Sequence, residues 1–516
     1  MDRRPVAART TSVRLAMLPI IGAIFLSLTA IAVAEPDSPA VPRNLSEESD
    51  ACLECHATVT PGIVGDWERS RHAGTTLDEA LAVAPLERRV SVSDVPDDLG
   101  AVCVGCAECH LLNPEKHRDT FDHNGYTVHT VVTPEDCASC HPVEAEQFAA
   151  NLMSAAHGNL MGNPLHRALE TAVNGLQHAV DGELLQDEAD ALTRAESCLS
   201  CHGTRIEVQE QAVRETSMGD MEFPVLAGWP NQGVGRVNPD SSRGACSACH
   251  TRHQFAVAMA RQPATCRQCH KGPDVPAYPV YEVSKHGNLY DTMRADWDFD
   301  AVPWVPGRDF TAPTCAACHI GLLTDGAGEI VAQRTHRMND RLAWRLFGLP
   351  YAHPHPLSAD TTPIHNRAGM PLPTELSGEP VFGHVIDATE MTARRARLEA
   401  ICGACHAAGW VAGHFDRLEH AIATTNDATL TATHLVQQAW DEGLADGPDR
   451  GASPFDEGIE RMWTAQWLFH ANSTRFASAM GGADYGVFAG GRWDLARNLR
   501  AMQEWLELRR EIGTGR

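Results

Sequence analysis

Apolar residues recur at every third or fourth position in four stretches of the last quarter of the chain. These stretches are residues 394–400, 418–441, 457–480 and 494–511. Within the third stretch, Ile459, Met462, Trp463 and Trp467 form one such stripe. This spacing aligns apolar side chains on one face of a helix, so the pattern predicts four helices that pack against other parts of the protein. The stretch 165–197 is predicted to be helical as well.

The rest of the chain shows no long alternation of apolar and polar residues, which is the usual sign of strands. It is interrupted instead by Pro, Gly, Asn and Asp, for example at 228–243 and 350–373. We therefore expect an all-α, loop-rich fold in which long helices are confined to the C-terminal region.

The N-terminus has the pattern of a secretory signal. Four arginines, at positions 3, 4, 9 and 14, accompany an apolar stretch at 15–33 that ends in the small residues Ala32-Val33-Ala34. We expect a signal peptide at 1–34, cleaved after Ala34, and a periplasmic mature protein. No later stretch approaches the ~20 continuous apolar residues that a membrane-spanning helix needs.

Eight copies of the motif Cys-x-x-Cys-His dominate the chemistry of the chain. They are Cys52/Cys55/His56, Cys106/Cys109/His110, Cys137/Cys140/His141, Cys198/Cys201/His202, Cys246/Cys249/His250, Cys266/Cys269/His270, Cys315/Cys318/His319 and Cys402/Cys405/His406. In each copy two thiols can bond to the vinyl groups of one haem while the His ligates its iron, which is the c-type attachment arrangement. Structural zinc sites combine two Cys pairs and need no His after every second Cys, so haem is the favoured interpretation.

We therefore expect eight covalently bound c-type haems per chain. The motifs use 16 of the 17 Cys, and the remaining one, Cys103, is expected to be a buried or free thiol. The 516 residues provide about 65 residues for each haem, fewer than the ~100 or more of a usual domain. The haems are therefore expected to form much of the core of a multihaem cytochrome c.

The formal charge of −25 disfavours nucleic acid and anionic membranes as partners. An acidic surface suits a basic electron-carrying protein that is attracted electrostatically. Acidity equally serves solubility alone, so the charge by itself does not identify a partner.

Second iron ligands are harder to predict, because a haem that only transfers electrons usually has one and a reactive haem keeps that position open. Three His follow an aromatic residue and a Ser and precede a small residue: His72, His157 and His286. The further candidates are His253, His129, His336, His353, His355 and His414, of which we include His253 in the predicted set. Counting His residues does not identify an iron with an open position.

Several longer segments resemble the octahaem hydroxylamine oxidoreductase family. They are GWPNQGVGRVNPD at 228–240, CSACHTRHQF at 246–255, GPDVPA at 272–277, SKHG at 284–287, YAHPHP at 351–356 and GADY at 482–485. The resemblance spans nearly the whole mature chain, with all eight haem motifs in order.

This resemblance implies that the fourth haem, held by Cys198, Cys201 and His202, is catalytic and open on its distal side. It implies that Tyr485 bonds covalently to that haem, usually from a neighbouring subunit of a homotrimer, and that its presence favours oxidation over reduction. Asp274 matches the active-site carboxylate of the family. Tyr351 matches its distal-pocket Tyr.

Two positions depart from many hydroxylamine-oxidising relatives. Val275 stands where these relatives have a His directly after the pocket Asp, and Val275 neither donates nor accepts a proton. Phe488-Ala489-Gly490 stands where they have Trp-His-Gly. Both departures bear on the substrate and the product more than on the fold.

We therefore predict a periplasmic oxidoreductase that oxidises hydroxylamine, to nitric oxide or nitrite, and passes electrons to a soluble or membrane-bound c-type cytochrome. The expected organisation is a signal peptide at 1–34, an octahaem catalytic and electron-transfer region at 35–415, and a helical region at 416–516 that carries the crosslinking Tyr. The alternatives left open are a hydrazine dehydrogenase, a nitrite or hydroxylamine reductase, and a non-catalytic electron conduit.

Overall fold

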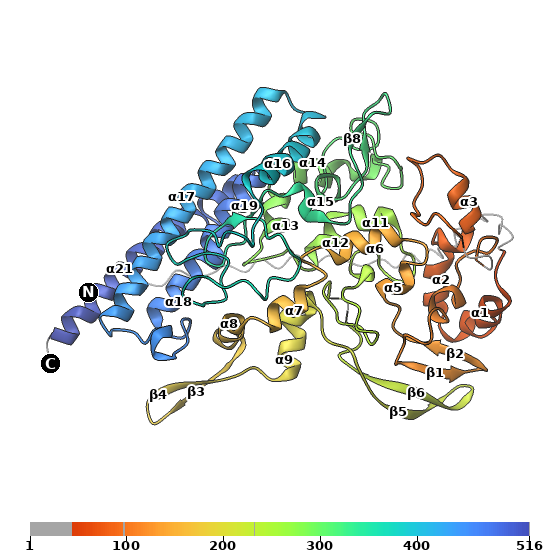
Figure 1. Cartoon of the computed structure of the whole chain (residues 1–516), viewed down its shortest axis with the longest axis horizontal. Coiled ribbons are helices and arrows are strands. Elements are labelled where there is room, and N and C mark those ends of the chain that lie inside the picture. Colours follow the sequence, from red (N-terminus) through yellow and green to blue (C-terminus); the bar gives the residue numbers. More distant parts are fainter. Residues whose placement is uncertain (1–43, 96–98, 232, 515–516) are drawn as a thin grey trace, which may run out of the picture. The chain divides into compact units, whose positions relative to one another are not determined.

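The computed structural model describes residues 44–95, 99–231 and 233–514, so the predicted signal peptide at 1–34 lies outside the described residues. Short helices joined by loops make up the first part, up to residue 319 (Figure 1). They are α1 (Glu47–Val59), α2 (Pro61–Glu68), α3 (Leu77–Ala82), α4 (Ala107–His110), α5 (Pro134–Cys137), α6 (Pro142–Ala149), α7 (Ala156–Met161), α8 (Pro164–Asn174), α9 (Ala191–Glu196), α10 (Cys198–His202), α11 (Val257–Arg261), α12 (Pro263–Arg267), α13 (Ala277–Glu282), α14 (Lys285–Met293) and α15 (Cys315–His319). Within the described residues, no helix is both long and apolar enough to cross a membrane.

Two-stranded antiparallel hairpins interrupt these helices, so the expectation of an all-α chain is wrong in this respect. The pairs in the described part are β1 (Thr120–His123) with β2 (Tyr126–His129), β3 (Leu176–Val180) with β4 (Glu183–Asp187), β5 (Glu207–Thr216) with β6 (Gly219–Ala227), β7 (Leu323–Thr324) with β8 (Ile330–Ala332), and β9 (Trp344–Arg345) with β10 (His353–Pro354). The helix predicted over 165–197 is likewise wrong in its middle, because α8 ends at Asn174 and the β3–β4 hairpin follows.

Two of the hairpins have a local cause in the sequence. The turns at Asn124-Gly125 and Asp181-Gly182 have positive φ at both residues. Type I′ turns require this conformation, which Asn, Asp and Gly adopt readily. The two dipeptides were therefore readable strand signals even without long alternation around them.

Further helices, which include the three longest of the described residues, follow after residue 387. They are α16 (Ala388–Gly403), α17 (Ala408–Asp441), α18 (Gly458–Ala465), α19 (Asn472–Met480), α20 (Ala483–Val487) and α21 (Arg492–Thr514), with one stretch of π-helix, η6 (Gln466–Ala471), between α18 and α19. The four periodic stretches of the sequence lie within α16, α17, the α18–η6–α19 segment and α21. Helix α17 contacts α18, α19 and α21 (Figure 1).

An apolar core holds these C-terminal helices together. Val436 of α17, Ile459 and Trp463 of α18, Trp467 of η6 and Leu506 of α21 are all buried in it. Trp463 and Trp467 are edge-to-face, with ring centres 6.0 Å apart, an arrangement that aromatic pairs favour. The helices therefore have a side-chain core of their own and support the segments packed against them.

Helix α19 carries a buried arginine that connects this core to a predicted site residue. The Arg475 guanidinium donates to four acceptors: Thr425 Oγ1 at 3.0 Å, Leu346 O at 3.2 Å, Asn472 Oδ1 at 3.2 Å and Asn426 Oδ1 at 2.7 Å. Burial lowers the pKa of Arg475 to about 9. Asn472 in turn donates through Nδ2 to the Asp274 carbonyl at 2.9 Å. Helix α19 therefore fixes the backbone at Asp274.

Replacing Arg475 by Met should destabilise the folded chain. We expect the free energy of unfolding to fall by about 3 kcal/mol, because several buried acceptors lose their donor and each unsatisfied buried group costs roughly 1–3 kcal/mol. Urea unfolding of the haem-loaded protein, followed by far-UV circular dichroism, measures the change. Arg475→Lys, which keeps the charge and fewer donors, should lose less, and equal stability in all three proteins would contradict the expectation.

Candidate functional site

Five of the attachment motifs each form one tight helical turn that is closed by the same backbone hydrogen bond. The amide of the motif His donates to the carbonyl of the first Cys, with N···O distances of 2.9 Å at His110, His141, His250, His270 and His406. Positions i, i+3 and i+4 share one face of such a turn. The spacing Cys-x-x-Cys-His therefore presents two thiols and an imidazole to the same cofactor.

Six complete motifs and part of motif two face a common cavity of about 2410 Å³. Its wall includes Cys109 of motif two and all the Cys and His of motifs three to eight: Cys137, Cys140, His141, Cys198, Cys201, His202, Cys246, Cys249, His250, Cys266, Cys269, His270, Cys315, Cys318, His319, Cys402, Cys405 and His406. Ordinary small-molecule pockets measure about 300–1,000 Å³, so this cavity has room for several cofactors. The thiols of the described residues form no disulfide. The residues present therefore fit covalently attached haems.

Thiols of different motifs lie beside one another. Four pairs are within hydrogen-bond reach: Cys52–Cys106, Cys137–Cys246, Cys201–Cys269 and Cys266–Cys315. Electrostatic interactions between thiols also join motifs two and three (Cys109–Cys140), five and six (Cys249–Cys266), and seven and eight (Cys318–Cys402). These contacts join the motifs in the order one, two, three, five, six, seven and eight, with motif four beside motif six.

Four pairs of imidazoles are spaced as two ligands of one iron would be. The ring centres are 6.1 Å apart for His56–His123, 6.4 Å for His72–His141, 6.3 Å for His250–His336 and 6.1 Å for His286–His406. Two imidazoles bonded at about 2.0–2.1 Å to the same metal have ring centres roughly 6 Å apart. Each pair combines a motif His with a second His, and these include the predicted His72 and His286.

Burial keeps several of these imidazoles neutral. It lowers the pKa of His72 and of His250 to about 4, and neighbouring His residues contribute to both shifts. Metals bind the neutral imidazole, so a low pKa leaves the ring ready to ligate near neutral pH.

His123 is a residue that the sequence reasoning missed. It ends β1, directly before the Asn124-Gly125 turn, and its pairing with Tyr126 across the hairpin closes that turn. The Asn124-Gly125 dipeptide could have predicted this hairpin, and His123 directly precedes it. Its ring lies across from His56 of motif one.

Motif one differs from the expectation that the attachment residues surround a haem-filled core. Cys55 is exposed, and Cys52, Cys55 and His56 are not among the described residues that line the cavity. The physical reason is the place of α1, which packs mainly against the short helices α2 and α4 and is therefore covered on one side only. The contact of Cys52 with Cys106 and the His56–His123 pair fit a haem near the surface. Attachment through Cys55 stays a prediction, at the surface and not in the core.

Motif two has two nearby candidates, and the ring geometry separates them. The ring centres of His110 and His129 are 6.0 Å apart. However, His110 Nδ1 lies 2.9 Å from the His129 carbonyl oxygen, so His129 is on the Nδ1 side of the ring, away from the iron-binding Nε2. His129 Nε2 is also 3.0 Å from the Leu112 carbonyl oxygen. The predicted His253, which interacts electrostatically with His110, is therefore the better candidate.

The shared Ser of the predicted ligand pattern has a structural role. Ser70 Oγ accepts a hydrogen bond from the Ala73 amide at 3.1 Å, and Ser284 Oγ accepts one from the Gly287 amide at 3.1 Å. Ser284 is the N-cap of α14, so it fixes the first turn, which carries His286. A Cβ at Gly287 would lie 2.1 Å from the Tyr281 carbonyl oxygen, so close backbone approach demands the small residue.

The predicted ligand His157 and two of the further candidates, His353 and His355, are placed as follows. His157 is buried, and its Nδ1 lies 2.7 Å from the Gly203 carbonyl oxygen, which leaves Nε2 available. His353 Nε2 is buried without a hydrogen-bond partner, which leaves this nitrogen available to a metal. His355 lines the cavity. Their roles as ligands stay predictions.

Motif four, the predicted catalytic position, brings two predicted residues together. His202 Nδ1 lies 3.4 Å from the Ala156 carbonyl oxygen, which orients the ring, and burial lowers its pKa. Asp274 lines the same cavity and acts electrostatically on both His202 and His270. His166, which the sequence reasoning missed, also lines the cavity, and burial followed by the nearby His202 lowers its pKa to about 4.

The two predicted site tyrosines lie outside this cavity. The Tyr351 hydroxyl oxygen is buried 2.7 Å from the Leu376 carbonyl oxygen and 2.9 Å from Thr433 Oγ1. Its hydroxyl is therefore occupied by the protein, and its role in the distal pocket stays a prediction. Tyr485 is half-buried on α20, where burial and then the nearby Glu282 raise its pKa.

Comparison with known proteins fits this geometry. A family model described as "Seven times multi-haem cytochrome CxxCH" matches residues 216–343. A "Probable nitrite reductase-hydroxylamine oxidoreductase fusion protein" of Kuenenia stuttgartiensis is 23% identical over 426 residues, which are 79% of this chain and 39% of that protein. The chain thus spans about two fifths of the length of this curated relative.

Solved structures add a fold likeness over most of the chain. The Kuenenia stuttgartiensis "reducing HAO-like protein complex" is 18% identical, with a TM-score of 0.60 over 91% of this chain and 86% of that chain. A "Hypothetical multiheme protein" is 39% identical, with a TM-score of 0.85 over 91% of this chain and 97% of that chain. The chain is a multihaem cytochrome c with the fold of a hydroxylamine oxidoreductase-like protein. This finding confirms the resemblance read from the sequence.

A pair of variants tests the ligands of this multihaem cytochrome at motif two. His253→Ala should convert one haem from low-spin to high-spin, because the iron loses a strong second ligand. His129→Gln, on the other side of the His110 ring, should leave every haem low-spin that is low-spin in the wild type. Electron paramagnetic resonance of the oxidised protein measures both, and the reverse result would assign His129 instead.

Proposed function

We propose that this multihaem cytochrome oxidises hydroxylamine at the haem of motif four and passes the electrons to a c-type cytochrome. The observation that carries the proposal is that Asp274 lines the same cavity as His202 and acts on it electrostatically. Oxidation of hydroxylamine releases protons together with electrons, so the reacting site needs a proton acceptor next to the iron. The name of the Kuenenia stuttgartiensis fusion protein supports the same class of chemistry.

The residues of the chain handle protons in this proposal. When bound, the haems supply redox-active iron, one of them open to substrate and the others carrying electrons. The Asp274 carboxylate accepts the proton that the substrate releases, and Asn472 holds its backbone in place. His166 provides an imidazole on the wall of the cavity, whereas Val275 provides no proton-handling group.

The neighbouring motifs provide the outlet for electrons. Motif four lies beside motif six through Cys201 and Cys269, and motif six lies between motifs five and seven. We propose eight bound haems, so that electrons leaving motif four have a continuous series of carriers. The formal charge of −25 suits a basic c-type cytochrome as the acceptor.

We further propose that Tyr485 completes the site of a neighbouring chain in a homotrimer. Tyr485 lies outside the cavity of its own chain, on the short helix α20. Close to it in sequence, Val487, Phe488 and Trp493 are 43%, 69% and 60% exposed. Large apolar side chains exposed together mark a contact surface, and the crosslink to the motif-four haem would then pass between chains.

Reduction of nitrite or hydroxylamine is the second candidate. The name of the Kuenenia stuttgartiensis "reducing HAO-like protein complex", whose fold is similar, is the observation in its favour. Tyr485 favours oxidation, because family members that lack this Tyr tend to act as reductases. Hydrazine is the alternative substrate for the same oxidative site, and a pure conduit would need a second ligand at every iron.

Tyr485→Phe tests the oxidative assignment. Phe preserves the ring volume but lacks the phenolic oxygen, so we expect loss of the crosslink and of hydroxylamine oxidation while the other haems keep their spectra. The measurements are the red-shifted band of a crosslinked haem in the dithionite-reduced spectrum and the covalent trimer that survives boiling in detergent. Tyr126→Phe on β2 is the matched control. Hydroxylamine oxidation that persists in Tyr485→Phe would remove Tyr485 from the chemistry.

Asp274→Asn tests the proton acceptor. Asn preserves the shape and loses the basicity, so we expect kcat to fall by ~10² to 10⁴, the usual cost of losing a general base. Asp291→Asn, which removes an exposed carboxylate paired with Arg294, is the matched control. Both variants are assayed with hydroxylamine and with hydrazine. If Asp274→Asn turns over both substrates at rates close to those of the wild type, Asp274 is not the proton acceptor. If the wild type is inactive on both substrates, the reductase function is favoured.

A further inference from the structure

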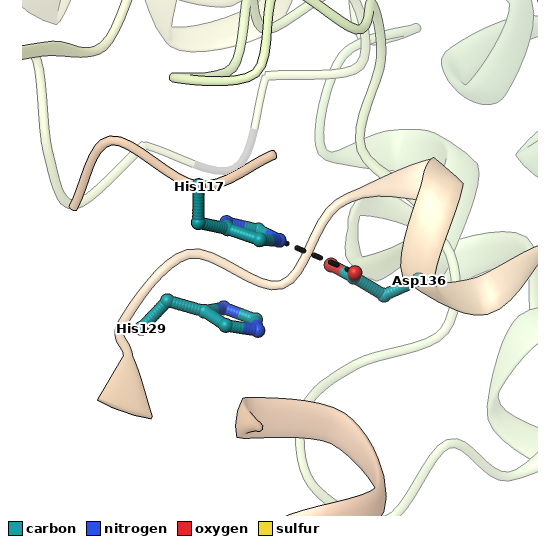
Figure 2. A group of neighbouring side chains, drawn as sticks. All are labelled: His117, His129 and Asp136. Atoms are coloured by element: carbon teal, nitrogen blue, oxygen red, sulfur yellow. Dashed lines mark hydrogen bonds and ion pairs between the residues drawn. The ribbon is translucent and has the colours of Figure 1, made fainter. Parts of the chain in front are cut away.

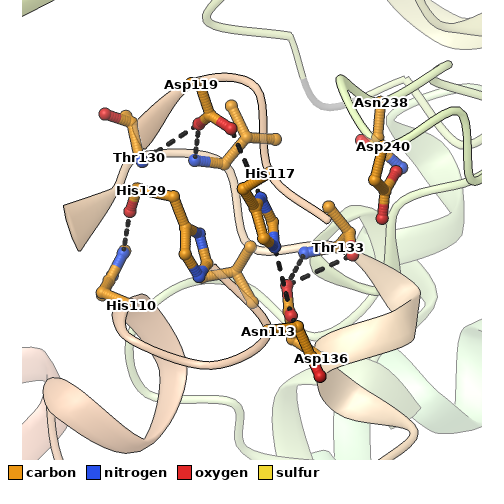
Figure 3. A network of polar contacts seen from close by, with 12 residues as sticks. His110, Asn113, His117, Asp119, His129, Thr130, Thr133, Asp136, Asn238 and Asp240 are labelled. Carbon is orange, nitrogen blue, oxygen red and sulfur yellow. Dashed lines mark hydrogen bonds and ion pairs between the residues drawn. The ribbon is translucent and has the colours of Figure 1, made fainter. Parts of the chain in front are cut away.

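A buried imidazole lies between two carboxylates near motif two. His117 Nδ1 is 3.3 Å from Asp119 Oδ1, and His117 Nε2 is 3.2 Å from Asp136 Oδ1. The side chains of all three residues are exposed by 1% or less. Figure 2 shows the His117 ring directed at Asp136, and Figure 3 shows Asp119 on its other side. We call these three residues the charge cluster.

The charge cluster is packed directly against the residue that orients His110. The rings of His117 and His129 are stacked, with centres 3.5 Å apart and planes 7° from parallel. The His129 carbonyl oxygen accepts the hydrogen bond from His110 Nδ1 at 2.9 Å. A hydrogen bond of this kind fixes the orientation and basicity of an imidazole that ligates a metal.

The two carboxylates also hold the backbone around the His residues. Asp119 Oδ2 accepts the Thr130 and Val131 amides at 3.0 and 2.9 Å, directly after His129 (Figure 3). Asp136 Oδ2 accepts the Thr133 amide at 2.8 Å, at the start of α5. Helix α5 ends at Cys137, the first Cys of motif three. The charge cluster thus connects the ligand of motif two to the attachment turn of motif three.

The balance of charge follows from these contacts. Burial alone would lower the pKa of His117, but the hydrogen bonds to Asp119 and Asp136 overcome burial and raise it to about 9. The same bonds outweigh burial at the carboxylates and lower the pKa of both. His117 is therefore a cation between two anions at neutral pH. Burial, and then the His117 charge, lower the pKa of His129 to about 4, so the stacked ring is neutral.

Two other charged groups belong to these surroundings. Asp240 lies on the neighbouring loop, with Oδ2 buried and without a hydrogen-bond partner (Figure 3). Arg252 acts electrostatically on His110 itself. Neither group bonds to His117, so the two carboxylates of the charge cluster remain its direct counter-charges.

We propose that His117, Asp119 and Asp136 position His110 through His129 and set the reduction potential of the haem at motif two. A buried cation near an iron favours its reduced form, and a buried anion favours its oxidised form, because charges interact strongly away from water. His117 is a positioning residue in this role, because it acts on His110 through the stacked His129. The inference rests on a haem bound at motif two and not on the identity of the substrate.

A metal ion held by the same residues is the alternative. One possible ligand atom from each of His117, His129 and Asp136 lies within 4.8 Å of the other two. The hydrogen bonds favour the charge cluster instead, because both His117 nitrogens face carboxylate oxygens. A ring nitrogen that donates a hydrogen bond has no lone pair for a metal.

Two substitutions of opposite charge test the proposal in the haem-loaded protein. His117→Gln removes the cation and should lower the midpoint potential of one haem. Asp119→Asn removes an anion and should raise the midpoint potential of the same haem. Spectroelectrochemical titration measures both shifts, and the high-spin haem of His253→Ala identifies the component that belongs to motif two. His178→Gln, which removes an exposed His beside Asp187, is the matched control and should shift no haem.

Midpoint potentials that shift in opposite directions in the two variants support the proposal. A loss of packing alone would not depend on the sign of the charge that was removed. Unchanged potentials, or shifts in the same direction, would overturn it. If His117→Gln does not fold, the test is whether the midpoint potential of this haem rises in Asp119→Asn. Elemental analysis that finds one non-haem metal per chain, lost in His117→Gln, would replace the proposal with a metal site. A wild type that does not oxidise hydroxylamine overturns the proposed function only, since the potentials are still measured.

Discussion

The helical turn that brings two thiols and an imidazole onto one face is the constraint on which the rest of the structure depends. Its hydrogen bond, from the motif His amide to the first Cys carbonyl, recurs with the same length in five motifs. Most of these turns face one interior, and a chain with about 65 residues for each turn has little left for long elements. Short helices, hairpins and loops around a large cavity are the outcome.

Around the cavity, buried arginines hold the backbone through hydrogen bonds, as apolar side chains do by packing in an ordinary core. Arg341 donates to the carbonyls of Ala317, Cys318 and Gly321 and so fixes the turn of motif seven. Arg236 donates to the Val132 and Asn231 carbonyls between motifs two and five. The acceptors around these guanidiniums are backbone carbonyls and, at Arg236, Asn238 Oδ1, so neutral groups hold each cation inside the protein. The charge cluster at His117 belongs to the same pattern of charge held by backbone and side-chain hydrogen bonds.

Features that depend on residues close together in the sequence could be predicted, whereas contacts between residues far apart in the sequence could not. The attachment motifs and the stripe from Ile459 to Trp467 are local patterns, and both have counterparts in the structure. His72 and His286 were found because a Ser fixes the turn around each of them. His123 and His166 were missed because only the folded chain places them beside His56 and His202. The position of motif one away from the cavity was missed for the same reason, because its motif is spelled like the other seven and only the packing of α1 sets it apart.

The contacts between thiols of different motifs have a consequence for how the protein is made. Cys137 and Cys246, or Cys201 and Cys269, come within hydrogen-bond reach in the folded chain although more than 60 residues separate the members of each pair. In an oxidising compartment, thiols so placed would form disulfides that block both motifs. In such a compartment these thiols reach haem unoxidised only if attachment precedes folding, so the proximity of the motifs bears on the order in which the protein is made.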